Sequence, residues 1–142
     1  MLILKLKASR ITILPSSDNF INATEEHKLK KVEAIIHSHK LDDVKLSLVS
    51  AGVIGMSISE IKAFGHSKDK DSTTRYRGTE YRVDFTTKIK IEAVVEDEMA
   101  DLVVQQISLA ARTGEIGDGK IFVLEIEQII RIRTQETGVA AI

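Results

Sequence analysis

The chain has 142 residues, of which 43% are hydrophobic and 29% are charged, so one soluble globular domain with a buried core is expected. Its formal net charge of -1 gives no general attraction for nucleic acid or an acidic membrane, so any anion-binding site must be local. The absence of cysteine excludes disulfides and thiolate metal sites, and the apolar runs are too short to span a bilayer.

Residues 1–29 differ in composition from the rest of the chain. The first acidic residue is Asp18, and Lys5, Lys7 and Arg10 come before it. A basic, serine-containing segment with few acids is typical of an organellar transit segment, which would direct the protein to a plastid. A disordered extension, an extra strand or an upstream start codon explains the same composition. Without a transit function for this segment, we expect a cytoplasmic protein.

Periodicity predicts a strand, a helix and a second strand in the next part of the chain. Residues 30–37 alternate and are rich in β-branched residues, as in a strand. Residues 40–52 carry apolar residues at helical spacing, and Gly52 is a natural C-terminal stop. Residues 55–64 predict the second strand, with one imperfect alternation. The helical apolar positions are Leu41, Val44, Leu48 and Ala51.

A long polar stretch follows, with the sequence GHSKDKDSTTRYRGTEYR and no periodicity of its own. A hairpin connection between two strands normally needs only two to five residues. A much longer loop in a compact domain is usually functional or disordered. We therefore interpret residues 65–83 as a candidate functional loop.

The second half predicts a third strand and a second helix. Residues 86–95 alternate cleanly, with Ile89, Ile91 and Ala93 on one face. Asp97 is the expected N-cap of the helix that follows. The apolar stripe of this helix includes Met99, Leu102, Val103, Ile107 and Ala110.

A fourth strand is expected from Lys120 to about Arg133. The resulting order is β-α-β-β-α-β, which indicates an α+β domain. In the ferredoxin-like version of this order, two helices cover one face of an antiparallel four-stranded sheet.

The turn before the fourth strand contains three glycines, although a plain helix-to-strand turn needs one. Gly117 and Gly119 flank Asp118, and Lys120 follows them. Glycines allow positive φ and let backbone N–H groups approach phosphate oxygens, while the lysine adds a point charge. The pattern predicts a phosphate-binding turn. A glycine-rich connection beside a solvated lysine is the alternative.

Arg131 and Arg133 are spaced i, i+2 on the expected last strand, so their guanidinium groups should project from one face. Two neighbouring guanidinium groups repel each other unless an anion or carboxylates lie between them. Surface salt bridges are the ordinary explanation of such a pair, and a bound anion is the alternative.

Two stretches resemble the signatures of the PII nitrogen-regulatory signal proteins: YRGTEY at residues 76–81 and TGEIGDGKIF at residues 113–122. The ending IRIRT at residues 130–134 and the short tail are also similar. The resemblance covers residues 30–142 and leaves the N-terminal extension outside. It implies a PII-like signalling domain with a T-loop at about 65–83, a B-loop at about 112–120 and a C-terminal tail at about 134–142.

The resemblance also implies a function. PII-like proteins are homotrimers that bind ATP or ADP in the clefts between subunits and sense 2-oxoglutarate together with Mg-ATP. They regulate enzymes and transporters of nitrogen and carbon metabolism through the T-loop, and they are adaptors rather than enzymes. Contact with a membrane would be indirect, through a transporter partner, and no contact with nucleic acid is implied.

For the nucleotide, the resemblance implies that the B-loop backbone and Lys120 contact the phosphates. Arg131 and Arg133 match a pair that reaches the phosphates across a subunit boundary. The residues that the resemblance assigns to nucleotide binding are Gly117, Asp118, Gly119, Lys120, Arg131 and Arg133, with Ser57, Gly65 and His66 beside them.

The effector site departs from the family pattern. Lys88 matches the lysine that pairs with a 2-oxoglutarate carboxylate. Ser67 stands where the family has a glutamine that helps to hold Mg²⁺ and 2-oxoglutarate, and a serine hydroxyl is shorter than that carboxamide. The chain is therefore either an ordinary PII protein or a divergent paralogue that binds adenine nucleotides but answers another effector.

The T-loop carries two candidate modification sites. Tyr81 matches a tyrosine that many bacterial relatives uridylylate, and an exposed position at a loop tip would make it reachable. Thr79 occupies the place of an alanine or of a phosphorylated serine in relatives. Contact with a partner is the alternative role for both side chains.

Other classes of function have weaker support in the sequence. An RNA-binding βαββαβ module stacks bases on aromatic residues in its central strands, whereas aromatic residues make up only 4% of this chain. No Walker loop is present, and slow ATP turnover is the one enzymatic activity that the sequence does not exclude. The four histidines form no HxxxH or HExxH pair, so no zinc site is expected.

Overall fold

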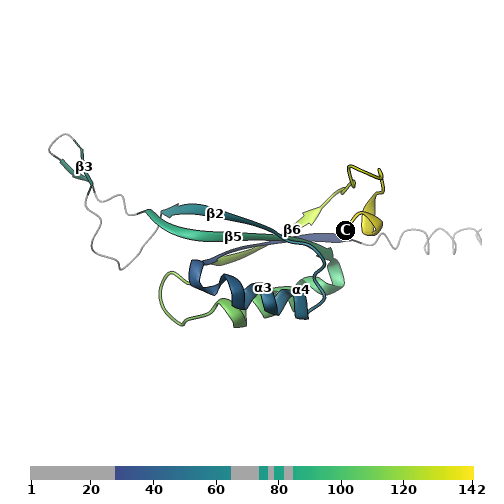
Figure 1. Ribbon diagram of the computed structural model, residues 1–142, viewed down its shortest axis with the longest axis horizontal. Helices are drawn as coiled ribbons and strands as arrows, with labels where there is room; N and C mark the ends of the chain where they lie inside the picture. The colour runs from purple at the N-terminus through teal and green to yellow at the C-terminus, as the bar shows by residue number, and fades with distance from the viewer. Residues whose placement is uncertain (1–27, 65–73, 77–78, 82–84) are drawn as a thin grey trace, which may run out of the picture.

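The computed structural model describes residues 28–64, 74–76, 79–81 and 85–142. A four-stranded sheet in the order β2-β5-β1-β6 is covered on one face by two helices (Figure 1). All neighbouring strands in this sheet are antiparallel. The elements are β1 (Leu29–His37), α3 (Leu41–Ser50), β2 (Ser57–Phe64), β5 (Phe85–Glu96), α4 (Asp97–Ala111) and β6 (Lys120–Ile126). The predicted ferredoxin-like α+β fold is confirmed.

The core lies between the sheet and the two helices. Every second residue is buried from Val32 to Ile36 in β1 and from Ile89 to Val95 in β5, as alternation predicts, and the register pairs Ile36 with Ile89. Val44 and Leu48 of α3, spaced i, i+4, are fully buried against these strands. Gly52 ends this helical segment with φ of 94°, as predicted from its position.

Helix α4 packs on the core along the predicted stripe, with the exception of Leu102. Val103 and Ile107 are buried as expected, together with Ala100 and Ala111. Leu102 is 42% exposed, because it lies on the side of the helix that faces away from the sheet. The small alanines allow the end turns of the helix to pack closely on the core.

The N-cap of α4 is also displaced by one residue from the prediction. Glu96 has the extended backbone of an N-cap, whereas Asp97 is already the first helical residue. An acidic residue there still favours the helix, since its charge lies near the positive end of the helix dipole.

The last strand is shorter than predicted. β6 ends at Ile126, and the chain then leaves the sheet instead of continuing to about Arg133. Ile130 forms an isolated antiparallel bridge with Thr137, and Gln135 turns between them with φ of 62°. A 3₁₀ helix, η2 (Gly138–Ala141), follows. Apolar and polar residues alternate from Ile130 to Arg133, but there the pattern belongs to a folded-back C-terminal loop.

The long connection between β2 and β5 contains a hairpin that periodicity did not predict. Its strands are β3 (Thr74–Tyr76) and β4 (Thr79–Tyr81), which pair antiparallel. Figure 1 shows this hairpin beyond one end of the sheet, away from the two helices. The candidate functional loop therefore carries its own small element of secondary structure.

Candidate functional site

The loop between α4 and β6 has the backbone conformation that its glycines suggested. Gly114, Gly117 and Gly119 have φ of 87°, 104° and 106°, a region that residues with a Cβ rarely adopt. At Gly119 an added Cβ would collide with the main-chain oxygen of Ile35 in β1. These three positions therefore favour glycine, and Gly119 packs directly on the neighbouring strand.

Asp118 holds this loop together from inside. One carboxylate oxygen accepts hydrogen bonds from the N–H groups of Thr113 (3.0 Å) and Gly114 (2.9 Å), and the other accepts from the Thr113 hydroxyl. The Thr113 hydroxyl, then the two backbone N–H groups and finally His37 favour the ionised form, so the pKa of Asp118 is lowered to about 2. Asp118 is an anion that closes the turn at physiological pH.

Lys88 and His37 link the same loop to the sheet. They face each other in the β1–β5 register, and Lys88 Nζ lies 2.9 Å from His37 Nδ1. Lys88 also donates to the carbonyl oxygen of Gly117 at 2.5 Å, and His37 Nε2 lies 3.3 Å from Asp118 Oδ1. Lys88 is only 8% exposed, so these polar contacts compensate a mostly buried ammonium group.

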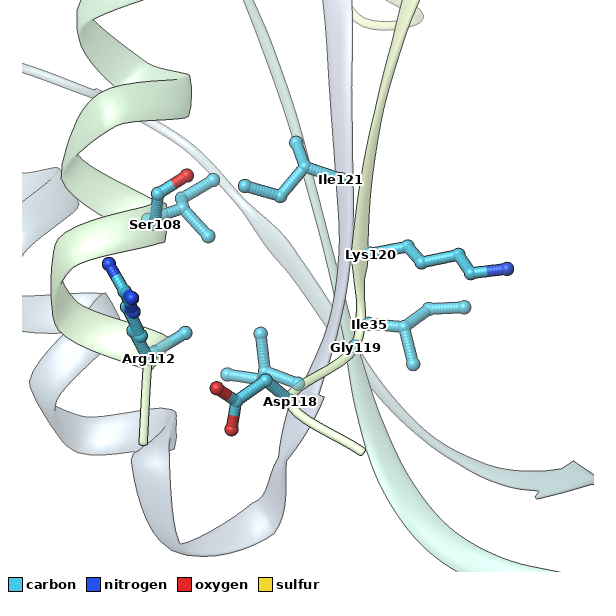
Figure 2. Close-up of a pocket in the computed structure, with 10 residues that line it drawn as sticks. Ile35, Ser108, Arg112, Asp118, Gly119, Lys120 and Ile121 are labelled. Carbon is cyan, nitrogen blue, oxygen red and sulfur yellow. The ribbon is translucent and has the colours of Figure 1, made fainter. Parts of the chain in front are cut away.

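A cavity of about 290 Å³ lies beside this loop, between the C-terminal end of α4 and the sheet. Figure 2 shows Ser108, Arg112 and Asp118 on the helix side of the sheet, whereas the side chain of Lys120 extends away from them to the other face. Lys120 is exposed, and its register partner in β1 is Ile35. The cavity is lined by Ile35, Ile36, Ile107, Ser108, Ala111, Arg112, Asp118, Gly119, Lys120 and Ile121.

The two candidate arginines lie in the C-terminal loop and not on a strand, which corrects the predicted i, i+2 pair. The Arg131 guanidinium donates to Glu136 Oε2 at 2.8 Å and to the main-chain oxygen of Ile142 at 2.6 Å. Arg133 lies in the turn that follows and is exposed. The two residues therefore have different surroundings, although the sequence spacing suggested one shared face.

The remaining candidate residues fall into two groups. Ser57 is exposed at the start of β2, and the backbones of Thr79 and Tyr81 lie in β4. Tyr81 pairs with Thr74 at the open end of the hairpin, while Thr79 pairs with Tyr76 next to the turn. Gly65, His66 and Ser67 lie outside the described residues.

Two residues of this site were not predicted. The sequence assigns no role to His37, one of four histidines for which no zinc site is expected, and Thr113 appears only as part of a motif. His37 acts through contacts with Lys88 and Asp118, which are distant in sequence. The side chain of Thr113 hydrogen-bonds within its own turn. The β1–β5 register is the signal that would have placed His37 beside Lys88.

The described part of the chain contains neither a candidate metal cluster nor a helix that could span a membrane. Among residues 28–64, 74–76, 79–81 and 85–142, no cluster of three His, Cys, Asp or Glu side chains could hold a metal ion. In that same part of the chain, no helix is both long and apolar enough to cross a membrane.

The sequence is similar to those of known regulatory proteins. The model of the family described as nitrogen regulatory protein P-II matches residues 29–136. The nitrogen regulatory protein P-II of Microchaete diplosiphon is 56% identical over 114 residues, which are 80% of this chain and the whole of that relative. With the same coverage, the protein of Rhodobacter capsulatus is 57% identical, and nitrogen regulatory protein P-II 1 of Escherichia coli K12 is 51% identical.

Proposed function

Because this chain belongs to the nitrogen regulatory protein P-II family, we propose that it is a signalling adaptor that binds ATP and ADP. The nucleotide binds in clefts between the subunits of a homotrimer, and its identity is transmitted to a partner enzyme or transporter through the T-loop, residues 65–83. The observation that carries this proposal is the glycine backbone of the loop before β6, closed by an internal carboxylate.

The B-loop supplies the phosphate contacts in this proposal. Positive φ at Gly117 and Gly119 shapes the turn before β6, and the backbone N–H groups of this turn are the phosphate donors in the proposal. The Asp118 carboxylate is occupied by Thr113 and Gly114, so its part in binding is to hold the backbone. Lys120, exposed and next to these amides, adds the positive charge.

The location of the arginines supports a site shared between two chains. The B-loop precedes β6 and Arg131 follows it, and Figure 1 shows the two segments at opposite ends of the sheet. Seven extended residues span about 20 Å, too far for one phosphate group to contact both in the same chain. A second subunit must therefore supply Arg131 and Arg133 if they contact the same phosphates as Lys120.

A nucleotide site of this kind needs no catalytic groups. Regulation by ligand binding requires only that ATP and ADP bind different T-loop states with different affinity. Mg²⁺ would accompany ATP, and Ser57, Gly65 and His66 would complete the nucleotide surroundings. Any ATP hydrolysis would then be slow and without a role in signalling.

A divergent response to the effector is the second candidate function. Lys88, the proposed carboxylate-binding residue, is engaged here by His37 and by the Gly117 carbonyl oxygen. Ser67 cannot reproduce the reach of a glutamine side chain toward Mg²⁺. In this version the protein binds adenine nucleotides but responds to 2-oxoglutarate weakly or to a different effector. Modification of Tyr81 or Thr79 would alter the partner-binding T-loop in either version.

Calorimetric titration with ATP and ADP tests the proposal, on protein whose trimeric mass has been established. We expect micromolar binding, and a loss of about tenfold or more in the Lys120→Ala variant, because a charged contact to phosphate is removed. Lys45→Ala is the matched control, since Lys45 lies on α3 and pairs with Asp42. No binding at hundreds of micromolar nucleotide would refute the proposal, and addition of 2-oxoglutarate separates the two versions.

A further inference from the structure

The contacts of His37 define its protonation state. A charged Lys88 ammonium can only donate, so His37 Nδ1 must accept its hydrogen bond and carry no proton. The imidazole proton is then on Nε2, the ring nitrogen that lies 3.3 Å from Asp118 Oδ1. The neutral Nε2–H tautomer is therefore the form that satisfies both neighbours at once.

Protonation of His37 would disrupt this arrangement on one side only. A proton on Nδ1 would face the Lys88 ammonium across 2.9 Å, so two donors and two positive charges would oppose each other. On the other side, Asp118 would attract the imidazolium. His37 would remain near the B-loop while Lys88 lost one acceptor, and the two cations would together favour an anion between them.

The other groups around His37 do not change this balance of charge. The ring of His39 in η1 (Ser38–Lys40) stacks on His37 with ring centroids 5.2 Å apart. From β5 the facing charge is Lys88, from the B-loop it is Asp118, and β6 carries the exposed Lys120 opposite Ile35. β2 places Ile61, an uncharged residue, in register with Lys88.

We propose that His37 and Lys88 form a proton-dependent binding site for a small carboxylate, in which His37 takes up a proton when the carboxylate binds. Neutral His37 competes with the ligand for the Lys88 ammonium, whereas protonated His37 becomes a second cation for it. The fraction of sites occupied by the carboxylate then depends on both its concentration and the pH. This inference rests on the proposed function, because it describes the site in which the effector lysine lies.

Linkage gives the expected size of the effect. If one proton is taken up with the ligand, the association constant rises as the pH falls, by up to about tenfold per pH unit. A ligand that bound Lys88 without involving His37 would show no such slope.

The test is titration of the full chain with 2-oxoglutarate between pH 6 and 8, with and without Mg-ATP. We expect wild-type affinity to rise about three- to tenfold per unit of acidification. His37→Gln, which accepts from Lys88 and donates to Asp118 without titrating, should bind weakly with little pH dependence. His37→Arg, whose charge is permanent, should bind more tightly than His37→Gln and also lack the slope. His39→Gln is the matched control and should behave like wild type.

The outcomes separate this inference from the nucleotide proposal. Parallel slopes in wild type and His37→Gln would overturn the inference, and so would the absence of 2-oxoglutarate binding in protein that binds ATP. If ATP does not bind but 2-oxoglutarate does so with the expected slope, the inference stands and the nucleotide proposal fails. Independently of any ligand, ¹⁵N NMR of the imidazole should show the Nε2–H tautomer at pH 8, and the opposite tautomer would contradict the inference.

Discussion

At the scale of single residues, the B-loop depends on Gly119 and Asp118, which have opposite physical roles. Gly119 is needed because it has no side chain, since any Cβ would occupy the position of the Ile35 carbonyl oxygen. Asp118 is needed because its side chain replaces missing backbone partners, by accepting hydrogen bonds at the end of α4. One residue provides space and the other provides acceptors.

Replacement of Gly119 by alanine should therefore be strongly destabilising. The collision with Ile35 is with main chain, which cannot rotate away, and φ of 106° adds strain. We expect a loss of roughly 2–4 kcal/mol in the free energy of unfolding, measured by urea denaturation at fixed protein concentration. Gly55→Ala is the control, because no atom lies within 4 Å of the position that a Cβ would take there and its φ is not positive. Equal effects of both substitutions would contradict this account.

Asp118 predicts a specific acid dependence of stability. Its pKa is lowered from 3.8 to about 2 in the folded chain, so the ionised carboxylate stabilises the fold fully above the unfolded value. That stabilisation is lost as the pH falls from about 4 toward 2. The difference in melting temperature between wild type and Asp118→Asn should be constant from pH 7 to 5 and shrink below pH 4. A difference that grew on acidification would show that another group is responsible.

At the scale of secondary-structure elements, the C-terminal loop connects to the proposed nucleotide site through Arg131. This residue is held by Glu136, whose carboxylate also accepts from the Thr134 hydroxyl at 2.6 Å. Its backbone N–H donates to the Glu136 carbonyl oxygen at 2.9 Å, so the contact closes the loop through main chain as well. Arg131 thus already has an internal carboxylate where a phosphate would bind.

Removal of that carboxylate charge should favour the nucleotide. In Glu136→Gln the side chain competes less strongly with phosphate for Arg131, so we expect ATP affinity to rise about two- to fivefold, the range for a partly exposed ion pair. Calorimetry measures this change. Glu127→Gln removes the same charge from an exposed position just after β6 and should leave the affinity unchanged. Weaker ATP binding in Glu136→Gln would indicate that the pair positions Arg131 instead.

The sequence predicted the elements of the core well, because they bury every second residue of a strand or one stripe of a helix. It failed where the same pattern had another cause. Apolar and polar residues alternate from Ile130 to Arg133 as in a strand, yet the chain folds back there, and Ile132 is 90% exposed. Three-residue strands such as β3 and β4 are too short to produce a periodic signal.

The site was predicted only where its residues are adjacent in sequence. The glycines at 114, 117 and 119 indicated a special turn, and the structure gives all three positive φ. The contacts of His37 with Lys88 and Asp118 join residues 51 and 81 positions apart, which no local pattern encodes. The role of Asp118 within its own loop also depends on the backbone geometry that the glycines create.

At the scale of the whole molecule, the residues of the proposed phosphate site lie at opposite ends of one strand. Lys120 begins β6, and Arg131 follows its far end. If these residues meet only between subunits, then a closed, head-to-tail ring makes one complete site per interface, as cyclic symmetry requires. Nucleotide binding and subunit assembly would then stabilise each other.

Mixed assemblies test this arrangement directly. Lys120→Ala and Arg131→Ala should each bind ATP about tenfold or more weakly as pure proteins, because every site lacks one half. After the two variants are unfolded and refolded together, about one quarter of the sites should contain an intact lysine and an intact arginine from different chains. Recovered stoichiometry, measured by calorimetry, would support the shared site. No recovery in mixed oligomers of confirmed composition would show that the two residues do not share a phosphate between chains.

The close packing of Gly119 on Ile35 has a mechanical consequence. A loop joined to its domain by flexible residues can move when a ligand binds without moving the domain. Here Gly119 is in close contact with the main chain of Ile35 at the junction with β6, so the loop cannot move independently. The next residue, Lys120, is already in register with Ile35, two positions before His37 at the end of β1. A displacement of the B-loop would therefore displace β1 with it. The end of β1 that would move is the one where His37 faces Lys88.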